Sequence, residues 1–259
     1  MELIIMKDYK EMSHQAATQV AAHIIVNPKL VLGLATGSTP VGMYEELIKM
    51  RKKGMVDFSG VVTFNLDEYL GLGPKDEASY RYFMFHNLFD GINIKHGNIN
   101  LLNGLARDPE TECRRYEKAI FAAGGIDLQI LGIGQNGHIG FNEPSAVFPT
   151  VTHIVDLSEE TRRVNAKFFR DKKKIPAQAL SVGIGTIMKA KEIMLLANTR
   201  EKAEAITEAI EGPVRPQVPA SVLQLHPKSA MILTEAAANG LHGIFKKSNK
   251  FSYIEKKVL

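Results

Sequence analysis

The feature that most constrains the fold of this chain is the regular alternation of short apolar runs with longer amphipathic segments. The apolar runs at residues 30–35, 61–66 and 126–132 contain one charged side chain between them. Such runs are typical of strands buried on both faces of a sheet. Because segments with helical spacing of apolar residues separate them, the sequence predicts an α/β fold. We expect a Rossmann-like, open, mostly parallel sheet with helices on both faces.

Helix-end signals place the expected helices between these strands. Asp8 stands before a segment of helical periodicity from residue 9 to 26, and Pro28 follows its end. An acidic capping residue before a segment and a proline after it are typical of the two ends of a helix. Pro40 suits the first turn of a helix that reaches about residue 53. The other expected helices are residues 79–89, 108–123 and 200–211, and the other short strands are residues 3–6, 99–101, 180–182, 192–197 and 230–233.

We expect a single domain over residues 1–259, because the sequence shows no internal repeat, low-complexity tract or Pro/Gly-rich linker. The periodicity weakens over about residues 144–180, and we interpret this region as a lid segment that can close over a ligand. The basic C-terminal tail, about residues 242–259, is interpreted as a solvated end that can be mobile.

Composition argues against nucleic-acid and membrane partners. The net charge is only +4 and the chain has no Trp, whereas a nucleic-acid-binding face needs clustered basic residues. No apolar stretch reaches the roughly 18–20 residues of a membrane span, and the N-terminus becomes charged too early for a signal peptide. Cys113 is the only cysteine, so no intramolecular disulfide can form. We therefore expect a cytoplasmic protein in which Cys113 is a buried thiol.

Ligands of open α/β sheets bind beyond the carboxyl ends of the strands, and three loops at such ends carry unusual residues. The first is residues 35–40, with the sequence ATGSTP. Gly37 permits a tight turn, and the hydroxyls of Ser38 and Thr39 can hold a phosphate together with the free amides of the next helix. The spacing excludes a Walker A loop. On its residues alone, the loop fits a phosphate site and an ordinary strand-to-helix turn equally well.

The second loop, residues 65–69 with the sequence NLDEY, has two adjacent acids at a strand end. One interpretation is a helix-capping Asp67 beside a solvated Glu68. The other is that Asp67 moves a proton on carbon, which requires burial to raise its pKa toward neutrality. The residues alone favour the first interpretation.

The third loop, residues 132–144, has the sequence GIGQNGHIGFNEP. Its glycines can bring the backbone close to a ligand, but it lies outside the first strand–helix turn where a dinucleotide-binding loop is found. His138 and Glu143 can form a pair in which the carboxylate fixes the imidazole tautomer. No second His or Cys stands at ligand spacing, so a zinc site is not indicated.

These three loops, together with SVLQLHP at residues 221–227, resemble the glucosamine-6-phosphate deaminase family. The resemblance extends over about residues 1–240. Related 6-phosphogluconolactonases share the fold but differ after the histidine, so the ending at residues 141–144 favours the deaminases. The resemblance implies conversion of glucosamine-6-phosphate and water to fructose-6-phosphate and ammonia, in amino-sugar catabolism and without a cofactor or metal.

The resemblance also implies catalytic roles. His138 would open the pyranose ring, with Asn136 and Glu143 in support. Asp67 would carry a proton between C2 and C1, and Glu68 could assist by accepting a hydrogen bond.

For the phosphate, the resemblance implies a cradle of Gly37, Ser38 and Thr39 with two cations, Lys167 and Lys202. Lys167 stands where family members commonly carry Arg, and Lys cannot form the bidentate contact of Arg. The neighbouring residues Arg162 and Arg163 are alternative sources of positive charge.

Regulation is expected to differ from that of enteric relatives, whose effector site uses basic residues after the third loop. His153 and Val155 stand near those positions, so an anionic effector would lack charged partners. We expect no activation by N-acetylglucosamine-6-phosphate, and a monomer or a small homo-oligomer.

Two other functions remain open at this point. One is a 6-phosphogluconolactonase-like hydrolase or another sugar-phosphate isomerase of this fold. The other is a non-catalytic sugar-phosphate sensor, which would need a DNA-binding segment that we do not expect here. The joint presence of Asp67, Asn136, His138 and Glu143 favours the deaminase.

Overall fold

The computed structural model describes residues 1–157, 159, 162, 166, 169, 175–242 and 254–255. The strands are β1 (Glu2–Met6), β2 (Val31–Leu34), β3 (Val62–Asn65), β4 (Asp67–Tyr69), β5 (Ile99–Asn100), β6 (Leu128–Gly132), β7 (His153–Asp156), β8 (Gln178–Ser181), β9 (Glu192–Ala197), β10 (Ser229–Thr234) and β11 (Ile254–Glu255). The α-helices are α1 (Tyr9–Val26), α2 (Val41–Lys52), α3 (Tyr80–Asn87), α4 (Pro109–Ala122), α6 (Ile184–Ile187) and α7 (Ala203–Glu211). The 3-10 helices are η1 (Phe89–Gly91), η2 (His96–Asn98), η5 (Arg200–Lys202) and η6 (Pro219–Leu225).

The main sheet has the strand order β11-β1-β10-β9-β6-β2-β3-β5. Neighbouring strands are parallel except for β1 and β11, which pair antiparallel. The prediction of an open, mostly parallel sheet is therefore confirmed. From β2 the chain moves outward through β3 to β5, whereas β6 starts on the other side and continues through β9 to β10. The boundary between the neighbouring strands β2 and β6 is the switch point, and such sheets bind ligands beyond the carboxyl ends of the strands there.

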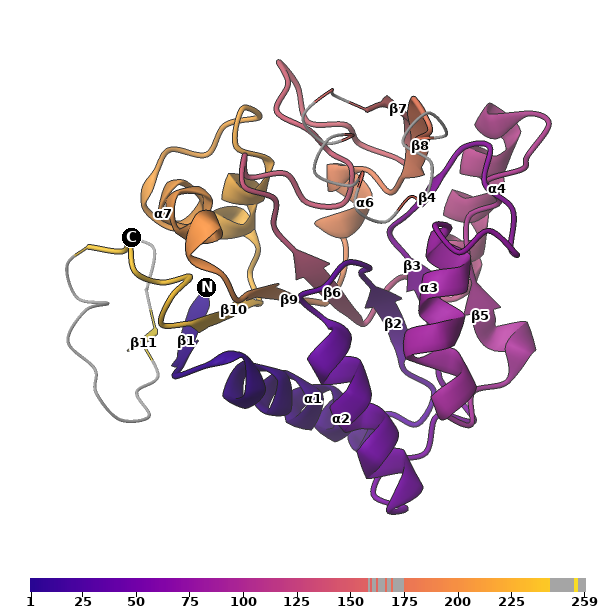
Figure 1. Ribbon diagram of the computed structural model, residues 1–259, viewed down its shortest axis with the longest axis horizontal. Helices are drawn as coiled ribbons and strands as arrows, with labels where there is room; N and C mark the ends of the chain where they lie inside the picture. Colours follow the sequence, from indigo (N-terminus) through magenta and orange to yellow (C-terminus); the bar gives the residue numbers. More distant parts are fainter. Residues whose placement is uncertain are drawn as a thin grey trace.

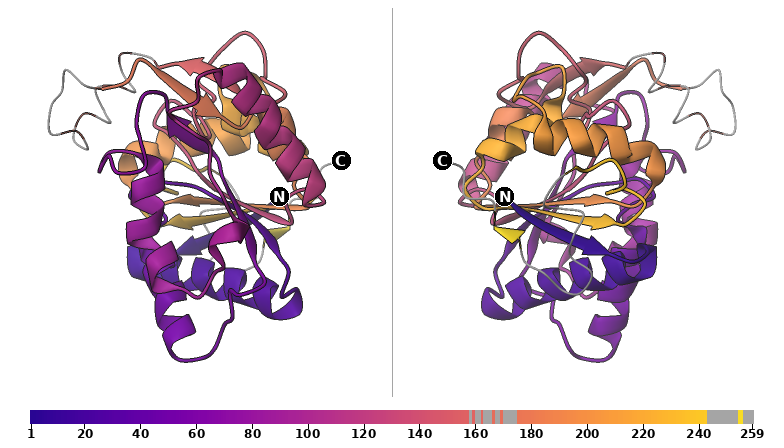
Figure 2. Two further views of the ribbon diagram at one scale, coloured as in Figure 1. Left: turned by 90° about the vertical axis from the view of Figure 1, so that its right-hand side faces the viewer. Right: turned by 90° about the vertical axis from the view of Figure 1, so that its left-hand side faces the viewer.

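Helices cover both faces of this sheet, as Figures 1 and 2 show. On one face, α1 and α2 pack against the strands, and Leu47 and Leu32 belong to the core formed there. On the other face lie α4, α6, α7 and η6, and Tyr116, Ile206 and Leu131 belong to that second core. Burial on both faces explains why the parallel strands are continuous apolar runs in the sequence.

Most helix ends agree with the capping signals. The Asp8 side chain accepts a hydrogen bond from the N–H of Glu11 at 2.9 Å, and the Asp108 side chain accepts one from the N–H of Thr111 at 3.1 Å. Pro40, expected inside the first turn, is instead the N-cap residue of α2. The helix expected over residues 200–211 begins as the 3-10 helix η5 before α7.

The sequence does not predict the second sheet, which has the strand order β4-β8-β7 and antiparallel pairs only. Its strands are three or four residues long, and such short segments carry little periodicity. β7 and most of β8 lie within the region interpreted as a lid. Between 158 and 174, only residues 159, 162, 166 and 169 of that region are described.

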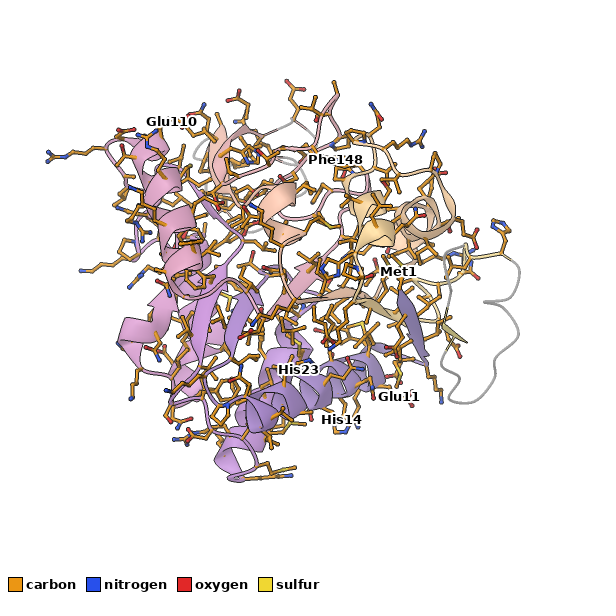
Figure 3. All side chains as sticks on the ribbon, turned by 180° about the vertical axis from the view of Figure 1, so that it is seen from behind. Met1, Glu11, His14, His23, Glu110 and Phe148 are labelled. Atoms are coloured by element: carbon orange, nitrogen blue, oxygen red, sulfur yellow. The ribbon has the colours of Figure 1, made fainter. Side chains whose placement is uncertain are left out.

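Two histidines of α1 lie far from the switch point. Figure 3 shows His14 and His23 on α1, across the sheet from Phe148. Nδ1 of His14 lies 3.4 Å from Oε2 of Glu46, and Nε2 of His23 lies 3.0 Å from Oε2 of Glu192. Both histidines therefore have carboxylate partners on the face of the sheet that α1 and α2 cover. Among the helices in the described ranges, none is both long enough and apolar enough to cross a membrane.

Candidate active site

A cavity of about 390 Å³ lies beyond the carboxyl ends of β2, β3, β6 and β9, at the switch point of the main sheet. Its lining comes from residues 35–39 after β2, from Leu66 and Asp67 after β3, and from the glycine-rich loop after β6. A fourth segment, within residues 198–202 after β9, completes it. The three loops singled out in the sequence therefore meet in one cavity.

The loop after β2 is braced by one tyrosine. The Tyr9 hydroxyl donates to the carbonyl of Ser38 at 3.0 Å and accepts from the N–H of Gly42 at 2.8 Å. Gly37 has a φ of 90°, a left-handed conformation that favours glycine. The loop leads directly into α2, whose N-terminal amides and dipole attract an anion.

Lys202 reaches this loop from the segment after β9. Its Nζ donates to Oγ1 of Thr39 at 2.8 Å, and that hydroxyl donates to Oδ1 of Asn198 at 3.1 Å. Glu201 also lines this end of the cavity. The pKa of Glu201 is lowered because its carboxylate accepts hydrogen bonds from its own N–H and from Thr199. This end of the cavity therefore combines the Lys202 ammonium group, several hydroxyls and the start of α2 with one negative charge, the Glu201 carboxylate.

Asp67 lines the cavity from the start of β4 and is only 6% exposed. Burial raises its pKa to about 8, and the negative charge of Glu68 adds to this rise. Within the described residues, Oδ1 of Asp67 has no hydrogen-bond partner. A carboxyl group that titrates near neutral pH can both remove and return a proton.

Glu68, and not Asp67, binds the N–H groups at the start of helix α3, whose N-cap residue is Ser79. Its carboxylate accepts hydrogen bonds from the N–H groups of Tyr69, Tyr80 and Arg81 at 2.8–2.9 Å. Burial raises the pKa of Glu68 to about 7, although these three donors stabilise its charged form. The interpretation favoured by the residues alone, a capping Asp67 beside a solvated Glu68, is wrong. The acid that binds the start of the helix is the second of the two, and it is buried.

The glycine-rich loop presents His138 to the cavity. A Cβ on Gly134 would lie 2.1 Å from the His138 ring, so only glycine allows the ring to pack against this backbone. Nδ1 of His138 lies 2.7 Å from Oδ1 of Asn136, and Nδ2 of Asn136 donates to Oε2 of Glu143 at 2.8 Å. Oε1 of Glu143 is 3.8 Å from Nδ1. The expected pair of His138 and Glu143 is thus a chain in which Asn136 is the middle member.

An aromatic wall, which the sequence reasoning misses, closes one side of the cavity. Tyr80 and Phe141 both line it, and their rings stack with centroids 5.8 Å apart and planes at 10°. Tyr69 lies behind them, with its ring centroid 4.9 Å from that of Tyr80. Such a wall limits the access of water to a bound ligand.

Asn198 and Thr199 are also absent from the sequence-based site. They follow β9 in the way that the three chosen loops follow β2, β3 and β6. The rule that ligands bind at strand ends would therefore have found them. The strand-end rule does not identify Tyr80, because this residue lines the cavity from the start of helix α3 and not from a loop that follows a strand.

The predicted site residues fall into four groups. Lys167 and the alternative cation Arg163 lie outside the described residues. Arg162, the other alternative, donates to the carbonyl of Ile175 at 3.5 Å and is not among the described residues that line the cavity. Glu143 contacts the site through Asn136. The predicted residues that line the cavity directly are Gly37, Ser38, Thr39, Asp67, Asn136, His138 and Lys202.

The chain is similar to known proteins over most of its length. The sequence model of the family described as glucosamine-6-phosphate isomerases/6-phosphogluconolactonase matches residues 7–232. A protein of Thermoanaerobacter pseudethanolicus named glucosamine-6-phosphate deaminase is 55% identical over 239 residues, which cover 92% of this chain and 94% of the relative. A protein of the same name from Clostridioides difficile is 51% identical over 242 residues, which cover 93% and 97% of the two chains.

Solved structures are also similar to this chain over more than 90% of its length. A structure described as a monomeric glucosamine-6-phosphate deaminase has a TM-score of 0.91 and 42% identity, and covers 93% of this chain and 100% of that one. The 6-phosphogluconolactonase of Trypanosoma cruzi has a TM-score of 0.72 and 19% identity, and covers 92% and 96% of the two chains. At that identity the likeness concerns the fold alone.

Proposed function

Because this chain belongs to the family of glucosamine-6-phosphate isomerases and 6-phosphogluconolactonases, we propose that it is a glucosamine-6-phosphate deaminase. It would convert glucosamine-6-phosphate and water to fructose-6-phosphate and ammonia, in amino-sugar catabolism, in the cytoplasm and without a cofactor. The observation that carries the proposal is a single cavity lined by a buried carboxyl group, Asp67, and an oriented imidazole, His138. Relatives named as this deaminase, similar over more than 90% of the chain, favour it over a lactonase.

His138 would open the sugar ring. Oδ1 of Asn136 can only accept, so Nδ1 of the neutral imidazole donates to it and Nε2 carries the lone pair. Nε2 can take the proton of the C1 hydroxyl and deliver it to the ring oxygen, which leaves an open-chain aldehyde. The Glu143 carboxylate, 3.8 Å from Nδ1, stabilises the imidazolium that forms between these steps.

Asp67 would then move one proton between neighbouring carbons. Its carboxylate removes the proton from C2, the electrons of that bond form a C1–C2 double bond, and the aldehyde oxygen takes up a proton from solvent water. Return of the proton from Asp67 to C1 leaves an iminium at C2, to which water adds before ammonia departs. Since burial brings the pKa of Asp67 to about 8, the group is a competent base and its conjugate acid a competent donor near neutral pH.

The phosphate would bind at the end of the cavity formed by Gly37, Ser38 and Thr39. The amides at the start of α2 provide donors, and Lys202, already hydrogen-bonded to Thr39, provides a positive charge. Lys167 is proposed as the second cation on the resemblance alone. Holding the phosphate there fixes the distance from C6 to the reacting carbons, which is how remote binding energy supports catalysis.

The test is an assay of ammonia and fructose-6-phosphate formed from glucosamine-6-phosphate, with Asp67→Asn beside the wild type. The wild type is expected to be active, and the variant to lose about 10²–10⁴-fold in kcat, because it lacks the base. Full activity of Asp67→Asn would remove the proton-transfer role. Hydrolysis of 6-phosphogluconolactone without ammonia release would establish the alternative function instead.

The phosphate site has a separate test with a matched lysine control. Lys202→Met is expected to raise the KM for glucosamine-6-phosphate about tenfold or more with a smaller effect on kcat, because a charge-assisted contact is lost. Lys191→Met is the control, since Lys191 pairs with Asp127 at the opposite ends of the strands. An unchanged KM in Lys202→Met would exclude Lys202 from the site, and Lys167→Ala tests the second cation in the same assay.

We also propose that N-acetylglucosamine-6-phosphate does not activate the enzyme, which would be a monomer or a small homo-oligomer. Burial lowers the pKa of His153 and so favours its neutral imidazole, and Val155 is buried. The nearby Glu117 carboxylate accepts hydrogen bonds from the N–H and hydroxyl of Thr152 at 2.7 and 2.6 Å, and its charge opposes an anion. The expected rate curve is hyperbolic with and without the effector. A sigmoidal curve that the effector makes hyperbolic would contradict this.

A further inference from the structure

Three buried polar side chains stand at alternate positions leading into the site. They are Thr63 and Asn65 of β3, followed by Asp67 at the start of β4. Thr63 and Asn65 are two residues apart on β3, so their side chains lie on the same face of the sheet, and a bend at Leu66 separates them from Asp67. Thr63 and Asn65 are each 1% exposed and pair in the sheet with Leu32 and Leu34, which belong to the apolar core under α1 and α2. Thr63 and Asn65 therefore face that core, and Asp67 follows after the bend at the cavity.

The polar atoms of this row lack protein partners. Within the described part of the chain, no hydrogen bond is made by Oγ1 of Thr63, by Oδ1 or Nδ2 of Asn65, or by Oδ1 of Asp67. The carbonyls beside them are satisfied, since Tyr116 donates to that of Asn65 at 2.8 Å and Asn100 donates to that of Thr63 at 3.1 Å. Buried polar groups are almost always hydrogen-bonded, and internal water supplies the bond where the protein does not.

The spacing of the row suits bridging water. Thr63 and Asn65, as alternate residues of one strand, are roughly 6.6 Å apart, which is close to the span of about 5.6 Å that a water with two hydrogen bonds of about 2.8 Å bridges. The two oxygens of Asp67 also differ. Oδ2 lies 3.8 Å from the place of a Cβ on Gly140, which lines the cavity, whereas Oδ1 is buried.

We propose that Thr63 and Asn65 are positioning residues that hold internal water behind Asp67, and that this water donates a hydrogen bond to Oδ1 while Oδ2 acts on the substrate. The proposal rests on the deaminase function for its catalytic part. A donor at Oδ1 stabilises the carboxylate form, and hence the base, in a site where burial opposes it. It also fixes the rotation of the carboxyl group, so that one oxygen serves both C2 and C1.

The catalytic part is tested by replacing the polar atoms with apolar groups of similar shape. In Asn65→Leu the acid limb of the pH profile of kcat/KM is expected to move up by about 0.5 pH unit or more, because the carboxylate loses a donor. Thr63→Val, the milder change, is expected to move it in the same direction by less. Ser13→Ala is the matched control, since Ser13 is also buried and its hydroxyl also has no partner among the described residues. Its profile is expected to match that of the wild type.

The water itself has two readouts that do not depend on activity. A high-resolution crystal structure of the wild type is expected to show ordered water within hydrogen-bond distance of both Asn65 and Oδ1 of Asp67. In addition, Asn65→Leu is expected not to raise the melting temperature, whereas replacing a dry, unpaired amide with an apolar group would raise it. Missing water density, a raised melting temperature, or unshifted acid limbs in both variants would each overturn the proposal. If the wild type releases no ammonia, the deaminase function fails, but the crystal structure and the melting temperature still decide whether internal water lies behind Asp67.

Discussion

The variant Asp67→Asn should be more stable than the wild type by an amount that grows as the pH rises, although it lacks the proposed base. In the folded protein the pKa of Asp67 is about 8, against an ordinary value of 3.8. The native state therefore binds this proton more tightly than the unfolded chain. The stability that the protonated group contributes is fully present below about pH 4 and is lost as the pH rises to 8. Asparagine cannot ionise, so the variant avoids this loss.

The size of the effect follows from the width of that pH window. Each pH unit between the two pKa values changes the free energy of unfolding by about 1.4 kcal/mol, so the advantage of the variant approaches about 6 kcal/mol at pH 8 and above. Between pH 5 and pH 9 the difference between variant and wild type should therefore grow by about 4 kcal/mol. Relaxation around a buried charge reduces such figures, and the measured rise with pH is more diagnostic than its absolute value.

The assay is urea denaturation at pH 5, 6, 7, 8 and 9, followed by circular dichroism because the chain has no Trp. Asp57→Asn is the matched control. The pKa of Asp57, which is exposed to solvent, is lowered by hydrogen bonds from Ser59 and Asn93, so its replacement should give no gain with rising pH. A difference between Asp67→Asn and the wild type that stays constant, or that shrinks toward pH 9, would refute the assignment of a buried carboxyl with a raised pKa.

Two further predictions concern the parts that hold the site in shape. Gly134→Ala should reduce kcat by at least about tenfold while the protein remains folded, because the new Cβ would lie 2.1 Å from the His138 ring and displace it; a normal kcat would show that the ring position is unimportant. Tyr9→Phe should lower the free energy of unfolding by about 1–2 kcal/mol and raise the KM more than it lowers kcat, because the bonds to Ser38 and Gly42 that brace the phosphate loop are lost. Urea denaturation and steady-state kinetics measure both, and a KM equal to that of the wild type would contradict the bracing role.

Local signals explain why much of the fold is predictable from the sequence. The apolar run at residues 30–35 becomes β2 (Val31–Leu34), and Asp8 caps α1 as its position indicates. Both depend on neighbouring residues only. The second sheet depends on pairing between distant segments, such as Asp67 with Ser181, and no local pattern records that pairing.

The sequence also indicated several of the polar groups that line the site. Parallel strands bring their carboxyl ends to one edge of a sheet, so the alternation of strands and helices predicts that the loops carrying Ser38, Asp67 and His138 lie on that edge, and the strand order brings them into one cavity. Lys202 reaches the same edge in the structure, where it hydrogen-bonds to the phosphate loop.

Only the tertiary structure decided what each group is able to do. Adjacent residues of a strand point to opposite sides, so the choice between Asp67 and Glu68 depends on which side faces the cavity and which side meets the start of α3. Packing gives Glu68 three backbone donors and leaves Asp67 buried at the cavity with a pKa near 8. Burial and hydrogen bonding are properties of the assembled fold, and for that reason the adjacent letters DE could not tell the proposed base from the acid that binds the start of α3.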